Sequence, residues 1–358
     1  AATVLVAAAP CALVISIPVT YVAAMGRASR DGVLIKGGIY LEELGRLRAI
    51  ALDKTGTLTH GRPELTEIHP LDGRDPDQLL TFAATAERRS EHPIARAIVR
   101  AADARNLTIG EPDTFHAAVG GGIHARIDGT DLTIASPDYT TSQGHDLNPA
   151  VTTVIEDLES NGNTTVVMAD PTGPLAVLAV ADTIRPQAAD TIHRLRALGV
   201  KHITMLTGDN PRTARAIATR AGIDHVDASL KPEDKAARIR QLVDEHHHVA
   251  MVGDGINDAP PLAAASVGIA MGTAGSDIAL ETADVALMAD DLTRLVTAIT
   301  IGRRTRRVVT QNLILSLIIL AALVPAALFG VIGLAAAVLA HELSELVVIL
   351  NGTRMAKK

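Results

Sequence analysis

Two long stretches without any charged residue constrain this chain more than any other feature. Residues 1–26 contain no charged side chain, and residues 313–340 contain none over 28 positions. An α-helix needs about 20 predominantly apolar residues to cross the hydrocarbon core of a membrane. Residues 343–351 carry only one charged side chain, that of Glu345, so the C-terminal region is long enough for two crossings. We therefore expect membrane helices at 1–26, 308–328 and 331–351.

Basic residues beside these stretches indicate how the chain is oriented. They occur at Arg27, Arg30 and Lys36, at 303–307, and at Arg354, Lys357 and Lys358. Because Lys and Arg are enriched on the cytoplasmic side of membrane proteins, we expect a multi-pass protein of the cell membrane. Residues 27–307 and the C-terminus would then face the cytoplasm.

The first residue already lies inside an apolar stretch, so we expect a piece of a longer protein that lacks its N-terminal part. A signal peptide is the alternative, but no charged segment precedes the apolar run as it would in one.

Composition narrows the class of protein further. A chain of 358 residues is long enough for two or more domains. The hydrophobic share of 47% and mean hydropathy of +0.24 are high, yet 20% of residues are charged, so the apolar excess must be local. A net charge of −7 and an aromatic share of 2% argue against a nucleic-acid partner. The single cysteine, Cys11, excludes a disulfide framework within this chain.

The polar middle of the chain alternates between short apolar runs and helical patterns. Strands are predicted at 48–52, 202–206 and 249–252, and helices at 186–198, 211–221 and 233–244. Repetition of strand, loop and helix predicts an α/β fold with a parallel sheet. Each predicted strand ends at an acidic loop, and open α/β sheets place their active sites at that end of the strands.

Residues 63–174 have a different character. Short strands are predicted at 123–127, 132–134 and 164–168, and helices at 77–87 and 93–102. This pattern is typical of an inserted α+β domain with an antiparallel sheet. We expect the α/β domain to comprise residues 27–62 and 175–302, with its sheet resuming near Leu175.

A set of polar residues follows the strands of the α/β domain. Asp53 could attack phosphorus as a nucleophile, although a lone Asp after a strand more often only caps a turn. The other polar residues that follow the strands favour phosphoryl transfer. Lys235 could neutralise phosphoryl oxygens, and Thr207 could donate a hydrogen bond to one of them. Asp254 could hold Mg²⁺ together with Asp53. Asp258 lies in the same motif as Asp254.

These residues occur in motifs that resemble the signatures of P-type ATPases. The motifs are Asp53-Lys54-Thr55-Gly56-Thr57-Leu58-Thr59, Thr207-Gly208-Asp209, Lys235 in Lys231-Pro232-Glu233-Asp234-Lys235, and Gly253-Asp254-Gly255-Ile256-Asn257-Asp258-Ala259-Pro260. The resemblance implies a haloacid-dehalogenase-like phosphorylation domain with an inserted nucleotide-binding domain, flanked by transmembrane helices. It also implies that Asp53 takes the γ-phosphoryl group of ATP, and that Asp209 binds the nucleotide.

The same resemblance implies a Mg²⁺ site made by Asp53, the Thr55 carbonyl and Asp254, with Asp258 behind them. Related phosphatases carry a second acid two residues after the nucleophile, and here that residue is Thr55. Because a threonine cannot shuttle the proton, we expect the aspartyl phosphate to persist. A phosphatase of this fold and a non-catalytic membrane protein are the alternative functions.

Two elements of the inserted domain resemble the heavy-metal subclass of these pumps. They are Ser90-Glu91-His92-Pro93 and the glycines Gly120 and Gly122. The resemblance implies that Glu91, His92, Gly120 and Gly122 bind the nucleotide. A solvated histidine and a hairpin turn are the alternative interpretations of the two elements. Glycines in such a loop allow the backbone to approach the nucleotide closely.

Three residues of the apolar stretches are candidate ligands for a transported metal. Cys11 follows Pro10, where many heavy-metal pumps carry Cys-Pro-Cys, and His341 and Glu342 resemble a His-Glu pair of the cobalt-type divalent branch. Thiol, imidazole and carboxylate together suit Co²⁺, Zn²⁺, Cd²⁺ or Ni²⁺ better than copper(I). An interfacial position of His341 is the alternative, and no role follows for Glu345.

One family element is absent from the printed sequence. P-type ATPases hydrolyse their aspartyl phosphate with a Thr-Gly-Glu loop of an actuator domain, and this chain contains no Thr-Gly-Glu. We expect the actuator domain in the missing N-terminal part. This piece alone should then become phosphorylated without completing a transport cycle.

Overall fold

The structure is a computed structural model and describes residues 4, 8, 11–71, 73–118, 121–255, 258–272 and 281–357, without the side chains of residues 11–13. Two groups predicted to bind a ligand therefore lie outside the description: Gly120 and the thiol of Cys11. The chain divides into two compact units. The first unit comprises Ala1–Asp53, Asp190–Ile203 and Pro232–Lys358, and the second comprises Lys54–Ala189 and Thr204–Lys231.

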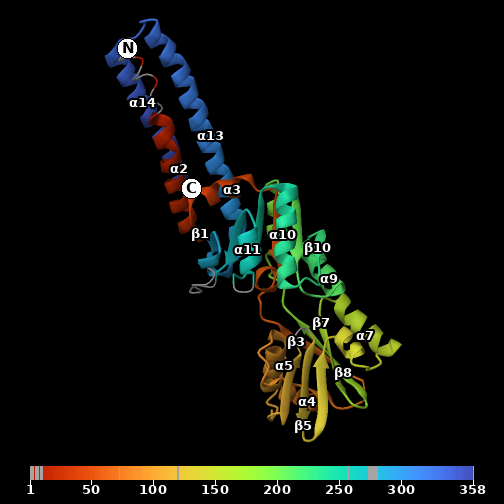
Figure 1. Cartoon of the computed structure of the whole chain (residues 1–358). Helices are drawn as coiled ribbons and strands as arrows, with labels where there is room; N and C mark the ends of the chain where they lie inside the picture. Colours follow the sequence, from red (N-terminus) through yellow and green to blue (C-terminus); the bar gives the residue numbers. More distant parts are fainter. Residues whose placement is uncertain are drawn as a thin grey trace. The chain divides into compact units, whose positions relative to one another are not determined.

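A mostly parallel sheet forms the core of the first unit (Figure 1). Its neighbouring strands, in spatial order, are β1 (Val33–Ile35), β13 (Val285–Leu287), β12 (Val267–Met271), β11 (Val249–Gly253) and β2 (Ala49–Asp53). The last four run parallel, and every residue in them is buried. Continuous burial of this kind is typical of parallel strands covered on both faces. β1 pairs antiparallel with β13 at the edge.

The next strand of this sheet is β9 (His202–Leu206), which enters beside β2. Just before β9, the backbone N–H of Lys201 donates to the Arg48 carbonyl at 3.0 Å. From residue 204 onward β9 belongs to the second unit, where it pairs in parallel with β10 (His225–Asp227). The strands predicted to end at acidic loops are thus confirmed as β2, β9 and β11.

Helices follow these strands, as the α/β pattern predicts. They are α3 (Gly38–Arg46), α8 (Ala188–Ala197), α9 (Pro211–Ala221), α10 (Pro232–His246) and α11 (Ala259–Ala264). α10 and α11 pack against each other and against β11. α9 begins at an Asn210 cap and ends at Gly222, whose positive φ of 73° suits the residue after a helix.

An antiparallel sheet forms the core of the second unit. Among the described residues it has six strands, in the order β3 (Glu64–Pro70), β8 (Gly173–Ala181), β7 (Thr164–Asp170), β6 (Thr130–Ala135), β5 (Gly122–Ile127) and β4 (Thr114–Ala118). The helices of this part are α4 (Pro76–Glu87), α5 (Pro93–Ala104), α6 (Pro137–Ser142) and α7 (Pro149–Ser160). The predicted α+β insertion is therefore confirmed.

The antiparallel sheet is buried on both faces. Val166 and Met168 of β7 point into one core, which also contains residues of α4 and α5 such as Leu80 and Ile98. Val167, between them in the chain, points to the opposite face and packs with Ile155 of α7. This follows from the period of two in a strand, which sends successive side chains to opposite faces.

The expected return of the parallel sheet near Leu175 is wrong. Leu175 lies in β8, and β8 pairs antiparallel with both β7 and β3. The run 175–180 is apolar at every position, so its composition fits a buried strand of either sheet. The parallel sheet resumes only at β9, after the chain has completed the antiparallel one.

Long helices complete the first unit. α2 (Cys11–Arg30) packs along both α13 (Thr293–Leu328) and α14 (Leu334–Thr353), and Figure 1 shows the three helices side by side. The Arg30 guanidinium donates to the carbonyl of Ala356 at 2.7 Å, which places Ala356 beside the end of α2.

α13 passes from the buried part of the unit into an apolar, exposed part without a break. Leu295 and Ile299 near its start are fully buried, whereas Leu317 and Ile318 are 55% and 60% exposed. Within the described residues, α13 and α14 are the two helices long and apolar enough to cross a membrane. Such a density of exposed aliphatic side chains fits a lipid surface better than water.

A backbone contact joins α3 to α13. A Cβ built on Gly45 would lie 2.8 Å from the Gly302 carbonyl, and one built on Gly302 would lie 2.7 Å from the Gly45 nitrogen. A side chain at either position would therefore force the helices apart. Only glycine at both positions allows this close crossing.

Candidate active site

The candidate site of the first unit lies at the carboxyl end of its central strands. Asp53 is the last residue of β2 and is 5% exposed. β2 and β11 pair in register, with Leu52 opposite Val252, so Asp53 and Asp254 come just after paired residues. The parallel sheet thus brings together two carboxylates that lie 201 positions apart in the sequence.

Lys235 joins two carboxylates of this site. It lies in the first turn of α10, and its Nζ is 2.5 Å from Asp53 Oδ1 and 3.0 Å from Asp258 Oδ1. Asp258 is nearly fully buried against Gly253, where a Cβ would lie 2.6 Å from Asp258 Oδ2. The glycine therefore makes room for the second carboxylate.

Burial and mutual repulsion shape the charge of the site. Loss of solvent, followed by the charge of Asp258, raises the pKa of Asp53 to about 7, although Lys235 acts in the opposite direction. Loss of solvent also raises the pKa of Asp258. Burial disfavours the ammonium form of Lys235, but Asp53 and Asp258 outweigh it and raise the lysine's pKa. Three carboxylates with one lysine leave a negative excess that a divalent cation would stabilise.

The loop after Asp53 is held from inside the second unit. Arg185, which is 2% exposed, donates to the carbonyls of Thr57 at 2.8 Å and Gly56 at 3.0 Å. Asp182 accepts from the Thr59 hydroxyl at 2.5 Å and from the Gly61 N–H at 3.1 Å. Sequence reasoning missed both Asp182 and Arg185, since neither belongs to a recognised motif.

The second unit also holds the other predicted polar residues. Lys54 forms an ion pair with Asp209 at 2.7 Å. The Thr207 hydroxyl accepts a hydrogen bond from the Asp209 N–H at 3.1 Å, which forms a tight turn after β9. Thr207 is buried, whereas Thr55 is exposed. The contact between Lys54 and Asp209 connects the first and second predicted motifs.

A separate cavity of about 390 Å³ lies within the antiparallel domain of the second unit. His92 and Gly122 line it, together with Glu87 and Ser90, whereas Glu91 is exposed and is not among its lining residues. Gly122 has a φ of 153°, and a Cβ there would lie 2.3 Å from the carbonyl of Ile134. Only glycine fits at this wall of the cavity.

Glu87 is the residue of this cavity that sequence reasoning missed. It ends α4, is 6% exposed, and its Oε2 has no hydrogen-bond partner among the described residues. Burial raises its pKa to about 7, against a hydrogen bond from Ser90. Burial also lowers the pKa of His92, whose Nδ1 accepts from the Ile94 N–H at the start of α5. The cavity therefore favours neutral forms of both groups.

The candidate metal ligands of α14 point in different directions. His341 Nε2 lies 3.3 Å from Glu345 Oε1, and these side chains are 12% and 16% exposed. Glu342 is exposed and so lies on another face of the helix. The i,i+4 spacing of His341 and Glu345 is the sequence signal that could have joined them. No cluster of three or more His, Cys, Asp or Glu suited to a metal occurs among the described residues.

Comparison with known sequences gives a consistent picture. The chain matches the haloacid dehalogenase-like hydrolase family over residues 47–266. Over 99% of its length it is 43% identical to a probable cadmium-transporting ATPase of Alkalihalophilus pseudofirmus, of which it covers 50%. Over its full length it is 40% identical to the manganese-exporting P-type ATPase of Mycobacterium tuberculosis, again covering 50%. The chain thus spans about half the length of the curated relatives it matches.

Solved structures agree with these sequences. The crystal structure of a zinc-transporting PIB-type ATPase in the E2.Pi state is 43% identical, with a TM-score of 0.75, and the match covers 97% of this chain and 56% of that one. The catalytic domain of the CPx-ATPase CopB-B is 30% identical, with a TM-score of 0.58, over 76% of this chain and 96% of that one.

Proposed function

The chain belongs to the haloacid dehalogenase-like hydrolases and, among them, to the heavy-metal-transporting P-type ATPases, and we propose that it is the catalytic and C-terminal membrane part of a pump driven by ATP. The pump exports a divalent heavy-metal cation through an aspartyl-phosphate intermediate. The observation that carries this proposal is the cluster in which Lys235 bridges Asp53 and Asp258 at the end of a buried strand.

In the proposed reaction a carboxylate oxygen of Asp53 attacks the γ-phosphorus of ATP. The bond from that phosphorus to the bridging oxygen breaks, and ADP leaves with the electron pair. Lys235 balances the charge of the nucleophile and of the phosphoryl oxygens, and the Thr207 hydroxyl donates to one of those oxygens. Asp53, the Thr55 carbonyl, Asp254 and, behind them, Asp258 would hold Mg²⁺. The ion supplies charge neutralisation between carboxylate and phosphate.

The nucleotide is proposed to bind in the second unit. The cavity beside His92 and Gly122 has apolar walls and a neutral imidazole, which suits a purine ring better than a phosphate. We assign Glu91, Gly120 and Asp209 to the same nucleotide on the strength of the motifs alone. Residues 63–181, which include β8 of the antiparallel sheet, would then be the nucleotide-binding domain, and residues 27–62 and 182–302 the phosphorylation domain.

The cargo is proposed to bind between the membrane helices. His341 and Glu345 share a covered face of α14, and they offer nitrogen and oxygen to a borderline divalent ion. Cys11 remains a candidate ligand from the sequence, and Glu342, which is exposed, is the alternative to Glu345. Relatives are named for cadmium, manganese and zinc, so Zn²⁺ and Cd²⁺ are the first cations to assay, followed by Mn²⁺, Co²⁺ and Ni²⁺. Residues 27–307 and the C-terminus would face the cytoplasm.

Phosphorylation by labelled ATP tests the proposed reaction. Incubation with ATP radioactive at its γ-phosphate should label the chain, with a bond that survives acid and is cleaved by hydroxylamine. Asp53→Asn should abolish the label, whereas Asp157→Asn, a change at an exposed position of α7, should leave it intact. Correctly folded protein that takes up no label would contradict the proposal. Label that disappears within one turnover without an actuator domain would favour a phosphatase.

A further inference from the structure

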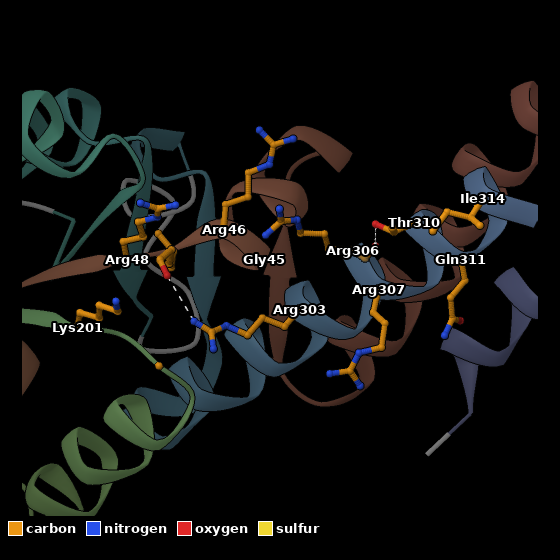
Figure 2. A pocket seen from close by; sticks show the side chains of 12 residues that line it. Gly45, Arg46, Arg48, Lys201, Arg303, Arg306, Arg307, Thr310, Gln311 and Ile314 are labelled. Atoms are coloured by element: carbon orange, nitrogen blue, oxygen red, sulfur yellow. Dashed lines mark hydrogen bonds between the residues drawn. The ribbon is translucent and has the colours of Figure 1, made fainter. Parts of the chain in front are cut away.

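A second large cavity, of about 700 Å³, lies in the first unit where α13 leaves the sheet (Figure 2). It is separate from the carboxylate cluster and has the opposite charge. Among the described residues, no acidic one lines it and six cationic ones do: Arg46, Arg48, Lys201, Arg303, Arg306 and Arg307. These side chains come from the end of α3, from the segments before β2 and β9, and from α13. Segments far apart in the sequence thus build one positive cavity.

Most of this charge has no counterion within the described part of the chain. Arg46 pairs with Glu42 one turn earlier in α3. Arg303 donates to the Leu47 carbonyl at 3.4 Å, but its Nε is buried without a hydrogen-bond partner among the described residues. For Arg48, Lys201, Arg306 and Arg307, no side-chain ion pair or hydrogen bond occurs among the described residues.

Such a concentration of unpaired cations is costly in the absence of an anion. Like charges repel each other, and a guanidinium that has lost water must find an acceptor. Burial lowers the pKa of Arg303, which reports the same loss of water around its guanidinium. The five N–H donors of each arginine match the oxygens of a phosphate group. The cavity therefore offers donors that suit a phosphate-bearing ligand.

The far end of the cavity shows which kind of ligand fits. Its lining continues along α13 through Thr310 and Gln311 to Ile314, which is 54% exposed. From there the helix surface becomes continuously apolar, with Leu317 and Ile318 exposed. One ligand could therefore place its phosphate among the arginines and its hydrocarbon along α13. A soluble phosphate compound would use the first part only.

We propose that this cavity binds the phosphate headgroup of an anionic phospholipid at the cytoplasmic surface of the membrane. The proposal rests on α13 crossing the membrane and is independent of the phosphorylation chemistry. Gly45 lines the cavity and touches Gly302 of α13. A lipid bound here would stabilise the crossing of α3 and α13, through which the catalytic unit is attached to its membrane helix.

The absence of tryptophan from the chain offers a direct test. Ile314→Trp introduces the only tryptophan of the chain at the apolar end of the cavity. The protein is placed in phosphatidylcholine nanodiscs that contain brominated phosphatidylglycerol or, separately, brominated phosphatidylcholine, since bromine quenches an adjacent indole. We expect severalfold stronger quenching by the anionic lipid at equal mole fraction. Leu346→Trp on α14, also exposed but outside the cavity, should show no such preference.

Charge variants complete the test. Arg306→Gln should lower the apparent affinity for phosphatidylglycerol roughly fivefold, the usual effect of one cationic residue near an anionic surface. Arg304→Gln is the matched control, because Arg304 is exposed on the same helix but does not line the cavity. Equal losses of affinity in the two variants would show that the lipid is attracted by general surface charge and not by this cavity, and would overturn the proposal.

The remaining outcomes are also distinguishable. In the Ile314→Trp protein, a shift of indole emission by millimolar pyrophosphate, without preference for the anionic lipid, would assign the cavity to a soluble phosphate compound and overturn the lipid proposal. Equal quenching by both lipids with no effect of pyrophosphate would show that no anion binds. Absence of quenching by either lipid would overturn the membrane assignment of α13 itself.

Discussion

At the scale of single residues, the ionisation of Asp53 governs the proposed chemistry. A carboxylate attacks phosphorus only when it is ionised, yet burial and Asp258 raise the pKa of Asp53 to about 7. Lys235 acts against both effects from 2.5 Å away. A divalent cation shared with Asp254 would favour the ionised form further. The positive partners would thus increase the fraction of Asp53 in the ionised form that the proposed attack requires.

We expect Thr55 to decide how long the proposed aspartyl phosphate survives. Thr55→Asp supplies the acid that related phosphatases use, and since general acid–base catalysis contributes about 10²–10⁴-fold, hydrolysis should accelerate by at least about tenfold. The decay of labelled protein after a chase with unlabelled ATP measures this rate. Thr55→Asn has nearly the same shape without the acid, so it should keep the slow decay. Equally fast decay in both variants would contradict the explanation.

Glu87 makes the stability of the second unit dependent on pH. Its pKa is about 7 in the folded chain and 4.5 in the unfolded one, so ionisation of the buried carboxyl costs little below pH 4.5, an increasing amount from pH 4.5 to about 7, and a constant amount above that. At pH 8 the penalty is at most about 3 kcal/mol. Glu87→Gln should raise the urea midpoint at pH 8 and leave it unchanged near pH 4.5. Glu91→Gln, at an exposed position, should change neither value.

At the scale of elements, the crossing of α3 and α13 joins the sheet to the membrane region. Gly45 and Gly302 meet backbone to backbone, and β2 begins three residues after α3 ends. We therefore expect a displacement of β2 to be transmitted to α13 through the short segment that joins β2 to α3. α13 itself continues without a break from buried residues into the apolar region, so we expect a movement at one end to be carried to the other.

Gly302→Val should break this crossing. The added side chain would enter space that the Gly45 backbone occupies, and overpacking of this kind costs about 1–3 kcal/mol. We expect a lower thermal midpoint in detergent and faster proteolysis between α3 and β2. Gly26→Ala is the control, since a Cβ at this helical glycine of α2 meets nothing within 4 Å. A stable Gly302→Val protein would show that the contact is not tight.

At the scale of the whole molecule, the proposed pump must connect a metal site in α14 to phosphorylation of Asp53. Both lie in the first unit, on elements joined by α13 and α3. His341 and Glu345 occupy the covered face of α14, while Glu342 does not. The structure thus adds Glu345 to the residues that the sequence singled out.

Metal dependence in the full-length protein tests this assignment. Glu345→Gln and His341→Ala should weaken the Zn²⁺ or Cd²⁺ concentration dependence of phosphorylation by about tenfold or more, since each removes one of few ligands. Glu342→Gln is the matched control, one position from His341, and should change it little. A larger effect of Glu342→Gln than of Glu345→Gln would instead favour His341 and Glu342, the pair that the sequence suggested, as the metal ligands.

The amino-acid sequence by itself determined the fold class, the strands that end at Asp53, Leu206 and Gly253, and the apolar helices at the C-terminus. These features depend on local hydrophobic periodicity and on motifs, both of which are written in short windows of sequence. Tertiary structure decided what depends on distant partners. It placed β8 in the antiparallel sheet, because an all-apolar run suits a buried strand of either sheet.

The same reason explains the residues that the sequence did not reveal. Glu87 became a candidate only when packing removed it from water, and Arg185 only when its guanidinium was found on the loop after Asp53. The basic cavity beside α13 comes from segments spread between Arg46 and Arg307. Charges so far apart in the chain act together only because folding brings them close in space. No local sequence pattern indicates which distant residues will become neighbours.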